Sequence, residues 1–434
     1  MSIKHKNEKV SNALRKKNDE LIGLGQSTYT PTQVVVTKAK GSWIWTADDR
    51  KLIDFSSGVL VANLGHNHRR FEQLVKDYSK GLPRNAYNML TEIQVTATEK
   101  LIKSVNSPWA QKALWAASGS EGIQKAMWCC LARYPERNIM VATRAGFHGK
   151  KGLANDVTGT ESKNPDVRWV SFPTTEEHTP AYYKKELQAL WKEHKGKIAL
   201  LITEPYLGAA GSFHPPKWYH QLLVTWCKQH NIPFIFDEVQ AGFGRTGNMY
   251  AFQSYDINPD MIVLGKGLGN GAQVSAVVGR ADLIDVLNYG EASDTYSASP
   301  RACAAVCAAL DVFKEEKVVD QGRKTGKRLK KHLDALVERF DFVKAVRGEG
   351  MVYGVEISDA ETANRCVVEA YHAGKKKGVH LLGPLAQKVL RISPPLTLSQ
   401  DELDEAFQWI HKSWARIETQ DRSSDLAAVC QSEE

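Results

Sequence analysis

The chain has 434 residues, 42% of them hydrophobic and 24% charged, which is typical of globular proteins with a sizeable core and excludes a disordered or fibrous chain. Its 57 Lys and Arg exceed its 49 Asp and Glu, but the two signs are interleaved, which favours small anionic ligands over nucleic acid. No apolar run approaches the roughly 18 residues of a membrane helix, so we expect a soluble, cytoplasmic protein. The seven cysteines include no C-x-x-C pair, so we expect them to be reduced and to bind no metal.

The densest basic run, KHKNEKVSNALRKK, begins at Lys4. It could be a nucleic-acid-binding arm or a targeting peptide. However, Glu8, Asp19 and Glu20 break the acid-poor pattern of transit peptides. A solvated, partly helical tail over residues 1–30 is therefore the preferred interpretation.

Strand-like and helical segments alternate over residues 138–271, which predicts an α/β fold with a mainly parallel sheet and helices on both faces. We place this large domain at residues 71–320. A smaller domain is expected to combine both chain ends, with residues 31–70 as a strand meander and residues 321–417 as its C-terminal part. Residues 418–434 lose periodicity and are expected to fray.

A capping motif follows one of the expected buried strands. Ser118, Gly119, Ser120 and Glu121 form the S-x-x-E pattern of a capping box, followed by helical periodicity. The N-terminus of a helix presents unpaired N–H groups and a positive dipole, so this turn could bind a phosphate. An ordinary cap that binds nothing is the alternative at this point.

Two short apolar runs each lead into a polar group. Pro233 to Phe236 lead into Asp237, and Met261 to Leu264 lead through a glycine into Lys266. In open α/β sheets ligands bind beyond the carboxyl ends of the strands, so an acid and an amine placed there can converge on one ligand. The central hypothesis is that they hold one cofactor.

The residue types suit a flat heteroaromatic ring. In an extended strand Val239 returns to the face of Asp237, so an apolar side chain could pack on the ring while the carboxylate keeps a ring nitrogen protonated. Lys266 lies between two glycines and could form a Schiff base with an aldehyde, then shuttle a proton, if its pKa is lowered. Considered alone, it could equally be a solvated lysine.

The segment between these two groups matches G-x-G-x-x-G from Gly242 to Gly247. A dinucleotide-binding turn requires the glycines to lead directly from a strand into a helix. Here DEVQA intervenes and no helical pattern begins before Met249. We therefore reject a nicotinamide cofactor.

Arg391 precedes Ser-Pro-Pro, which holds the backbone extended at this point. A guanidinium in this setting could bind a substrate carboxylate through two parallel hydrogen bonds. A surface salt bridge is the alternative.

Taken together, these motifs resemble the class III, or ω-type, pyridoxal-phosphate-dependent aminotransferases of fold type I, over residues 31–414. The resemblance rests on SGSE at Ser118, FHG at Phe147, EP-x-x-G at Glu204, FDEVQAGFGRTG at Phe236, PD-x-x-x-x-GKGLGNG at Pro259, T-Y at Thr295 and R-x-x-PPL at Arg391. It implies a large domain with a mainly parallel, seven-stranded-type sheet flanked by helices, and a smaller α+β domain.

The resemblance also implies roles for single residues, with Lys266 and Asp237 as the catalytic pair. Lys266 would be the Schiff-base lysine and Asp237 the partner of the pyridinium nitrogen. Gln240 would bond the ring hydroxyl, and Phe147 would stack opposite Val239. The full cofactor-binding set would be Ser118, Gly119, Ser120, Phe147, His148, Glu204, Asp237, Val239, Gln240, Lys266 and Thr295.

The implied assembly is a homodimer with shared active sites, because Thr295 would reach the phosphate of the neighbouring subunit. Arg245, in the glycine-rich segment, is expected to point toward the dimer contact. Nucleic-acid and membrane partners are not expected. Whether dimers form tetramers does not follow from the sequence.

The expected activity is transfer of an amino group from an amino acid, ω-amino acid or amine to a 2-oxo acid such as pyruvate or 2-oxoglutarate. A racemase or aminomutase, a decarboxylating transaminase and a phospholyase remain alternatives of the same fold. Val59 is expected to face the substrate. Many ornithine- and aminobutyrate-type members carry a glutamate where this chain has Ala209, so that Arg391 is left free. The donor, the acceptor and the stereochemistry do not follow from the sequence.

Overall fold

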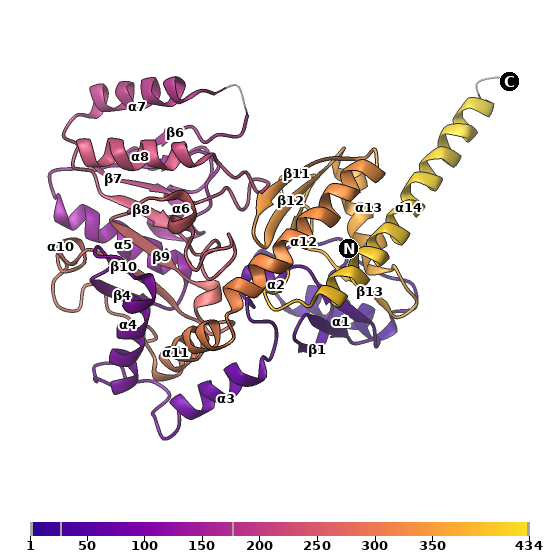
Figure 1. The fold of residues 1–434 in the computed structure, drawn as a ribbon, viewed down its shortest axis with the longest axis horizontal. Helices are drawn as coiled ribbons and strands as arrows, with labels where there is room; N and C mark the ends of the chain where they lie inside the picture. The colour runs from indigo at the N-terminus through magenta and orange to yellow at the C-terminus, as the bar shows by residue number, and fades with distance from the viewer. Residues whose placement is uncertain (1–2, 27, 176–177, 432–434) are drawn as a thin grey trace.

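The computed structural model describes residues 3–26, 28–175 and 178–431, with side chains described as far as residue 419. Figure 1 shows two bodies side by side, with the first and last helices, α1 (Lys9–Leu21) and α14 (Gln400–Gln431), at the smaller one. The larger body contains a seven-stranded sheet, and the smaller body contains sheets of four and three strands. The domain boundaries expected from the sequence stay a prediction.

The seven-stranded sheet has the strand order β4-β10-β9-β8-β7-β5-β6. Its strands are β4 (Lys112–Ala116), β5 (Ile139–Thr143), β6 (Val167–Val170), β7 (Ile198–Thr203), β8 (Phe234–Asp237), β9 (Met261–Leu264) and β10 (Ser275–Gly279). Strand β10 is antiparallel to both neighbours, and the other pairs are parallel. The mainly parallel sheet is thus confirmed, although the sequence pattern did not indicate β6 or β10.

Both faces of this sheet are covered, which explains why its central strands are apolar except at their last residues, such as Asp237 of β8 and Thr203 of β7. Along β8, Phe234 and Phe236 belong to one core cluster, whereas Ile235 belongs to the other. Successive residues of the neighbouring strand β9 also alternate between the two core clusters. Helix α5 (Gly119–Arg133) covers the second face, packing Ile123 and other apolar residues against it.

The remaining helices of the larger body flank the sheet or connect its strands (Figure 1). They are α3 (Arg69–Tyr78), α4 (Glu92–Val105), α6 (Gly152–Asp156), α7 (Pro180–His194), α8 (Lys217–Gln229), α9 (Ala251–Tyr255), α10 (Ala281–Ile284) and α11 (Pro300–Glu315). The sequence suggests one long linking helix after residue 300. The structure divides it into α11 and α12 (Val318–Arg339), because Lys317 adopts a left-handed conformation with φ of 50°.

The smaller body joins segments from both chain ends. Its sheets contain β1 (Val36–Lys40), β2 (Trp43–Thr46), β3 (Lys51–Asp54) and β13 (Lys377–His380), and β11 (Val343–Glu349), β12 (Val352–Ile357) and β14 (Val389–Ile392). Strands β1 to β3 form the expected antiparallel meander. Strand β13 pairs in parallel with β3, so one sheet contains residues from both ends of the chain.

The terminal helices differ from the sequence-based expectation. Helix α1 (Lys9–Leu21) is anchored by a buried ion pair between Glu8 and Arg15 at 2.9 Å, each side chain no more than 3% exposed. It is therefore helical as expected but more than a solvated tail. Helices α13 (Ala360–Tyr371) and α14 (Gln400–Gln431) pack together, and α14 stays helical past residue 418, where fraying was expected.

Three further observations concern the described residues alone. None of the helices within them has the length and apolarity required to cross a bilayer. They contain no group of three or more His, Cys, Asp or Glu side chains placed to hold a metal ion. The six cysteines whose side chains are described are buried and free.

Candidate active site

A cavity of about 230 Å³, here called the central cavity, lies where β5, β7, β8 and β9 end. It is lined by Ser118, Gly119, Ser120, Phe147, His148, Gly149, Glu204, Asp237, Val239, Gln240 and Lys266. These are all of the expected cofactor-binding residues except Thr295, with Gly149 in addition. The carboxyl ends of adjacent strands therefore bring the predicted acid and amine to one site.

Lys266 lies two residues beyond β9 and opens a 3₁₀ turn. Its φ of 43° is in the left-handed region, which non-glycine residues seldom adopt and which is concentrated at functional sites. Its burial within the cavity lowers the pKa of the amine to about 8, and the charge of Arg391 acts in the same direction. Asp237 and Glu204 oppose this shift. The amine therefore has an accessible neutral form near physiological pH.

Asp237 is held by two hydrogen bonds at the end of β8. Its Oδ2 lies 2.8 Å from His148 Nδ1, and its Oδ1 accepts a hydrogen bond from the backbone N–H of Val239 at 3.0 Å. Both the Asp237 and His148 side chains are buried. His148 Nε2 is buried without a hydrogen-bond partner. The imidazole thus fixes the orientation of the carboxylate.

Glu204 is a second buried carboxyl group, at the end of β7. Its Oε2 accepts a hydrogen bond from the backbone N–H of Phe147 at 2.8 Å. Burial raises its pKa to about 7, and the charge of Asp237 adds to the rise, while His148, Lys266 and the hydrogen bond from Phe147 lower it. Glu204 therefore positions the Phe147 loop.

The N-terminus of α5 forms the capping box predicted from the sequence. Ser118 Oγ accepts from Glu121 N at 3.4 Å, and Glu121 Oε2 accepts from Ser118 N at 3.0 Å. The next two N–H groups, of Gly119 and Ser120, have no acceptor within the helix because they belong to its first turn. An anion placed there would receive both hydrogen bonds and the favourable end of the helix dipole.

Glycines allow close packing around this turn. A Cβ on Gly119 would lie 3.1 Å from Val239 Cγ1, and a Cβ on Gly149 would lie 2.3 Å from Ser120 Oγ. The backbone of the FHG loop, the helix N-terminus and Val239 can therefore enclose one small ligand. A planar ring with an acidic side group and a basic nitrogen fits this set of groups.

Arg391, on β14, borders the central cavity through Gln240. Its Nη1 donates to Gly208 O and Gln240 Oε1, both at 3.4 Å, and its Nε has no partner. The side chain is only 3% exposed. Burial lowers its pKa, whereas Tyr206 and Glu204 oppose that change. The guanidinium is thus enclosed with neutral acceptors only.

Tyr206 is a polar group in this region that the sequence interpretation missed. Its ring stacks on His214 with centroids 4.4 Å apart, and its buried hydroxyl has no hydrogen-bond partner. Burial raises its pKa, while Arg391 and Arg245 lower it, so the hydroxyl lies in their field. The sequence feature that could have indicated this residue is its position within the EP-x-x-G turn, directly after a buried strand.

Two further expected positions lie outside the cavity lining. Thr295 is exposed, and its carbonyl accepts from Asn85 Nδ2 at 2.6 Å. Val59 is 40% exposed on a left-handed turn, α2 (Ser57–Leu60). Both stay predictions for an assembly or a substrate-bound form.

The expectation for Arg245 was wrong. It is fully buried within this chain, where its Nε and Nη2 bond Asn63 Oδ1 at 3.0 and 2.6 Å and its Nη1 bonds Pro394 O. Arg245 therefore fastens the glycine-rich connection of the larger body to segments of the smaller one. It does not reach the surface.

Comparison with known proteins decides the family. The model of the family described as Aminotransferase class-III matches residues 24–413. The chain belongs to this family. It is similar to an acetylornithine aminotransferase of Methanopyrus kandleri, with 31% identity over 88% of this chain and 94% of that protein.

Two further relatives broaden the comparison. A leucine/methionine racemase of Thermococcus litoralis is 27% identical over 90% of this chain and 92% of that protein. The PLP-bound crystal structure of an amine transaminase from an uncultivated Pseudomonas species superimposes with a TM-score of 0.82, at 25% identity over 92% of this chain and 98% of the other. This aminotransferase therefore has the fold of PLP fold type I transaminases, and its cofactor is pyridoxal phosphate.

Proposed function

We propose that this aminotransferase takes its amino group from a donor that carries a carboxylate and passes it to a 2-oxo acid, with Arg391 binding the carboxylate. The observation that carries the proposal is a buried guanidinium with an unpartnered Nε beside the central cavity. Among the described residues, no carboxylate lies within ion-pair distance of it. A buried, unpaired charge is costly, and an incoming carboxylate would supply its partner.

Ala209 supports this assignment. Where many ornithine- and aminobutyrate-type members carry a glutamate that would pair with this arginine, the methyl group of Ala209 offers no charge. Arg391 is thus free for a substrate carboxylate in both half-reactions. We assign to the hydroxyl of Tyr206, which is also unpartnered and lies in the field of Arg391, a hydrogen bond to the same group.

The residues around the central cavity have separable proposed roles toward pyridoxal phosphate. Gly119 and Ser120 N–H groups bind its phosphate, and Val239 and Phe147 pack on the two faces of its ring. Asp237, oriented by His148, keeps the ring nitrogen protonated. When bound, the cofactor supplies an electron sink for the charge left on the donor carbon.

Lys266 is the proposed proton carrier. Its pKa of about 8 means that the amine can accept a proton from the donor carbon and give it up again near neutral pH. The left-handed backbone and the packed glycines on either side fix the starting point of the side chain. Lys266 can therefore serve both as cofactor anchor and as acid–base group.

A racemase is the second candidate, because a relative named leucine/methionine racemase matches most of the chain. The same lysine and aspartate would serve it. The two activities differ in whether the donor is converted to an oxo acid. We favour the aminotransferase because it is the activity of the family to which the chain belongs.

We further propose a cytoplasmic homodimer. Asn85 and Tyr87 contact the Thr295 and Ser293 segment through hydrogen bonds of 2.6 and 3.4 Å. Large exposed hydrophobic side chains occur in these same loops, at Tyr87, Met89, Leu90, Tyr289 and Tyr296. Such groups on a monomer indicate a protein interface, and Thr295 would meet the phosphate of the second copy there. The free, buried cysteines suit a reducing compartment.

The test is a panel of paired donors that differ only in a carboxylate, each mixed with the holoenzyme and monitored by the visible absorbance of the cofactor. We expect rapid bleaching by the carboxylate-bearing member of each pair. Equal rates within pairs would reject Arg391 as the clamp. Light scattering measures the dimer, and a monomer at micromolar concentration would reject the shared site.

A further inference from the structure

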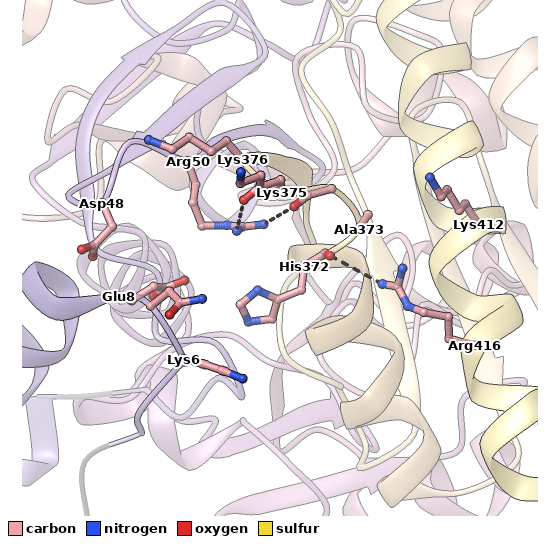
Figure 2. Close-up of a pocket in the computed structure, with 12 residues that line it drawn as sticks. Lys6, Glu8, Asp48, Arg50, His372, Ala373, Lys375, Lys376, Lys412 and Arg416 are labelled. Atoms are coloured by element: carbon pink, nitrogen blue, oxygen red, sulfur yellow. Dashed lines mark hydrogen bonds between the residues drawn. The ribbon is translucent and has the colours of Figure 1, made fainter. Parts of the chain in front are cut away.

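Two basic runs that lie far apart in the sequence meet in the smaller body. One is the N-terminal run that begins at Lys4, and the other is Lys375 to Lys377. With helix α14 they enclose a cavity of about 660 Å³, here called the lysine pocket (Figure 2). It is lined by Lys6, Asn7, Glu8, Asp48, Arg50, His372, Ala373, Gly374, Lys375, Lys376, Lys412 and Arg416, and it shares no residue with the central cavity.

The two acidic residues of the lysine pocket are already engaged. Glu8 accepts hydrogen bonds from Arg15 at 2.9 Å and from the Tyr371 hydroxyl at 2.7 Å. Asp48 accepts from the backbone N–H groups of Val10 and Ser11, at 3.0 and 2.8 Å. Asp48 thereby caps helix α1. Glu8 is thus paired with Arg15, and Asp48 leaves one negative charge against the cations that line the pocket.

The cations of the lysine pocket are in excess. Within the described part of the chain, Lys6, Lys375 and Lys412 have no carboxylate at ion-pair distance. Lys376 reaches Asp49 only at 4.0 Å. Arg416 alone has a close partner, Glu369 at 2.7 Å. The amines approach from different elements, as Figure 2 shows for Lys6 on one side and Lys412 on α14 on the other.

Arg50 places a fixed positive charge at the wall of the pocket. It is only 8% exposed, and its Nη groups donate to carbonyl oxygens of Tyr371, Gly374 and Lys375 at 2.6 to 3.1 Å. Its Nε is buried without a partner. Its hydrogen-bond acceptors are all neutral carbonyl oxygens, and these bonds hold the loop that carries Lys375 and Lys376.

His372 lies in the same positive field. Burial, together with the charges of Arg50 and His5, lowers its pKa to about 4, while Glu8 opposes the shift. Its Nε2 lies 3.2 Å from His5 Nδ1. A neutral imidazole therefore stands among the lysines, able to pack against or hydrogen-bond a ligand.

We propose that the lysine pocket binds a small multivalent anion of the polyphosphate class. Its volume lies in the usual range for small-molecule sites, roughly 300 to 1,000 Å³, and it is concave rather than an extended strip or a flat face. Ammonium groups act as point charges toward phosphates, whereas carboxylates favour the planar fork of arginine. Here the cations without a bonded partner are lysines, whereas the Nη groups of Arg50 bind carbonyl oxygens and Arg416 pairs with Glu369.

The test titrates the pyridoxal-phosphate-loaded enzyme with sodium tripolyphosphate by calorimetry at constant ionic strength. The loaded form is required because the phosphate site of the central cavity is then filled. We expect saturable binding with one ligand per subunit. The double variant Lys375→Gln/Lys412→Gln should bind at least about tenfold more weakly.

The matched control is Lys327→Gln/Lys331→Gln, which removes the same charge from an exposed groove along α12. It should leave the affinity unchanged. Equal weakening in both variants would overturn the proposal in favour of non-specific attraction. Citrate binding as tight as tripolyphosphate would overturn the ligand class, and binding of single-stranded RNA or anionic vesicles without tripolyphosphate binding would overturn the small-molecule site.

Discussion

The molecule concentrates positive charge in two places, and the two differ in how that charge is held. In the central cavity, Lys266 lies near two buried carboxyl groups, Asp237 and Glu204, and the buried Arg391 borders the cavity. In the lysine pocket, Lys375 and its neighbours stand exposed around one buried arginine.

This difference predicts how each region responds to substitution. Burial makes every charge change the pKa or orientation of its neighbours, because little water screens it. Exposed charges act together and individually contribute little. Single substitutions should therefore be severe in the central cavity and mild in the lysine pocket.

The largest effect is expected from Lys266→Ala. Removal of the anchoring amine and proton carrier should lower kcat by at least about 10³-fold and abolish the visible absorbance of the bound cofactor. The matched control, Lys375→Ala, should retain both. If the purified Lys266 variant kept the band and could still be trapped by borohydride, another lysine would hold the cofactor.

Asp237→Asn should come next. The amide keeps the shape but cannot hold the ring nitrogen protonated, so kcat should fall by about 10²-fold while cofactor content, measured by absorbance after denaturation, stays near one per subunit. A variant with near-normal kcat would contradict the role of this carboxylate. Loss of the cofactor would instead indicate that Asp237 mainly binds it.

Arg391→Ala should raise KM for carboxylate-bearing donors by about 10- to 100-fold, since a charge-assisted pair is lost. Steady-state kinetics with a non-carboxylate amine provide the control, where KM should change little. A similar rise for both donors would show that Arg391 supports the site rather than binding the substrate.

The rate of cofactor uptake should depend on pH through the amine of Lys266. Above its pKa of about 8 the Lys266 amine is neutral and nucleophilic. The rate at which the apoenzyme takes up pyridoxal phosphate should therefore rise about tenfold between pH 7 and 9 and then level off. A rate still rising at pH 10 would mean that burial does not shift this lysine.

The smallest catalytic effect is expected from the Lys375→Gln/Lys412→Gln variant without added anion. Its kcat and KM should stay within about twofold of wild type, because the lysine pocket shares no residue with the central cavity. A larger change measured by steady-state kinetics would show that the two regions are not separate.

The comparison also shows what a sequence can predict. Asp237 and Lys266 each follow a short apolar strand, and because β8 and β9 are parallel neighbours, their meeting followed from periodicity and fold class. The capping box at Ser118 could also be predicted, because its residues lie close together in the sequence. Such features depend on contacts close in sequence or on the rules of parallel sheets.

Other contacts depend on how distant loops pack, and no local pattern reveals them. The pairing of His148 with Asp237, the burial of Arg245 against Asn63 and the unpartnered hydroxyl of Tyr206 are of this kind. The basic N-terminal run was interpreted as a solvated tail. The parallel pairing of β3 with β13 and the contacts of Glu8 with Tyr371 and of His5 with His372 bring it near the Lys375 loop.

The most direct test of the central claim is a single turnover without acceptor. An enantiopure carboxylate-bearing donor that the panel shows to react is mixed in excess with the holoenzyme, and the oxo acid formed from the donor and the optical purity of the remaining donor are measured. The account predicts one oxo acid per subunit, loss of the visible band and no change in optical purity. Continued racemisation of the donor with the band intact would contradict it.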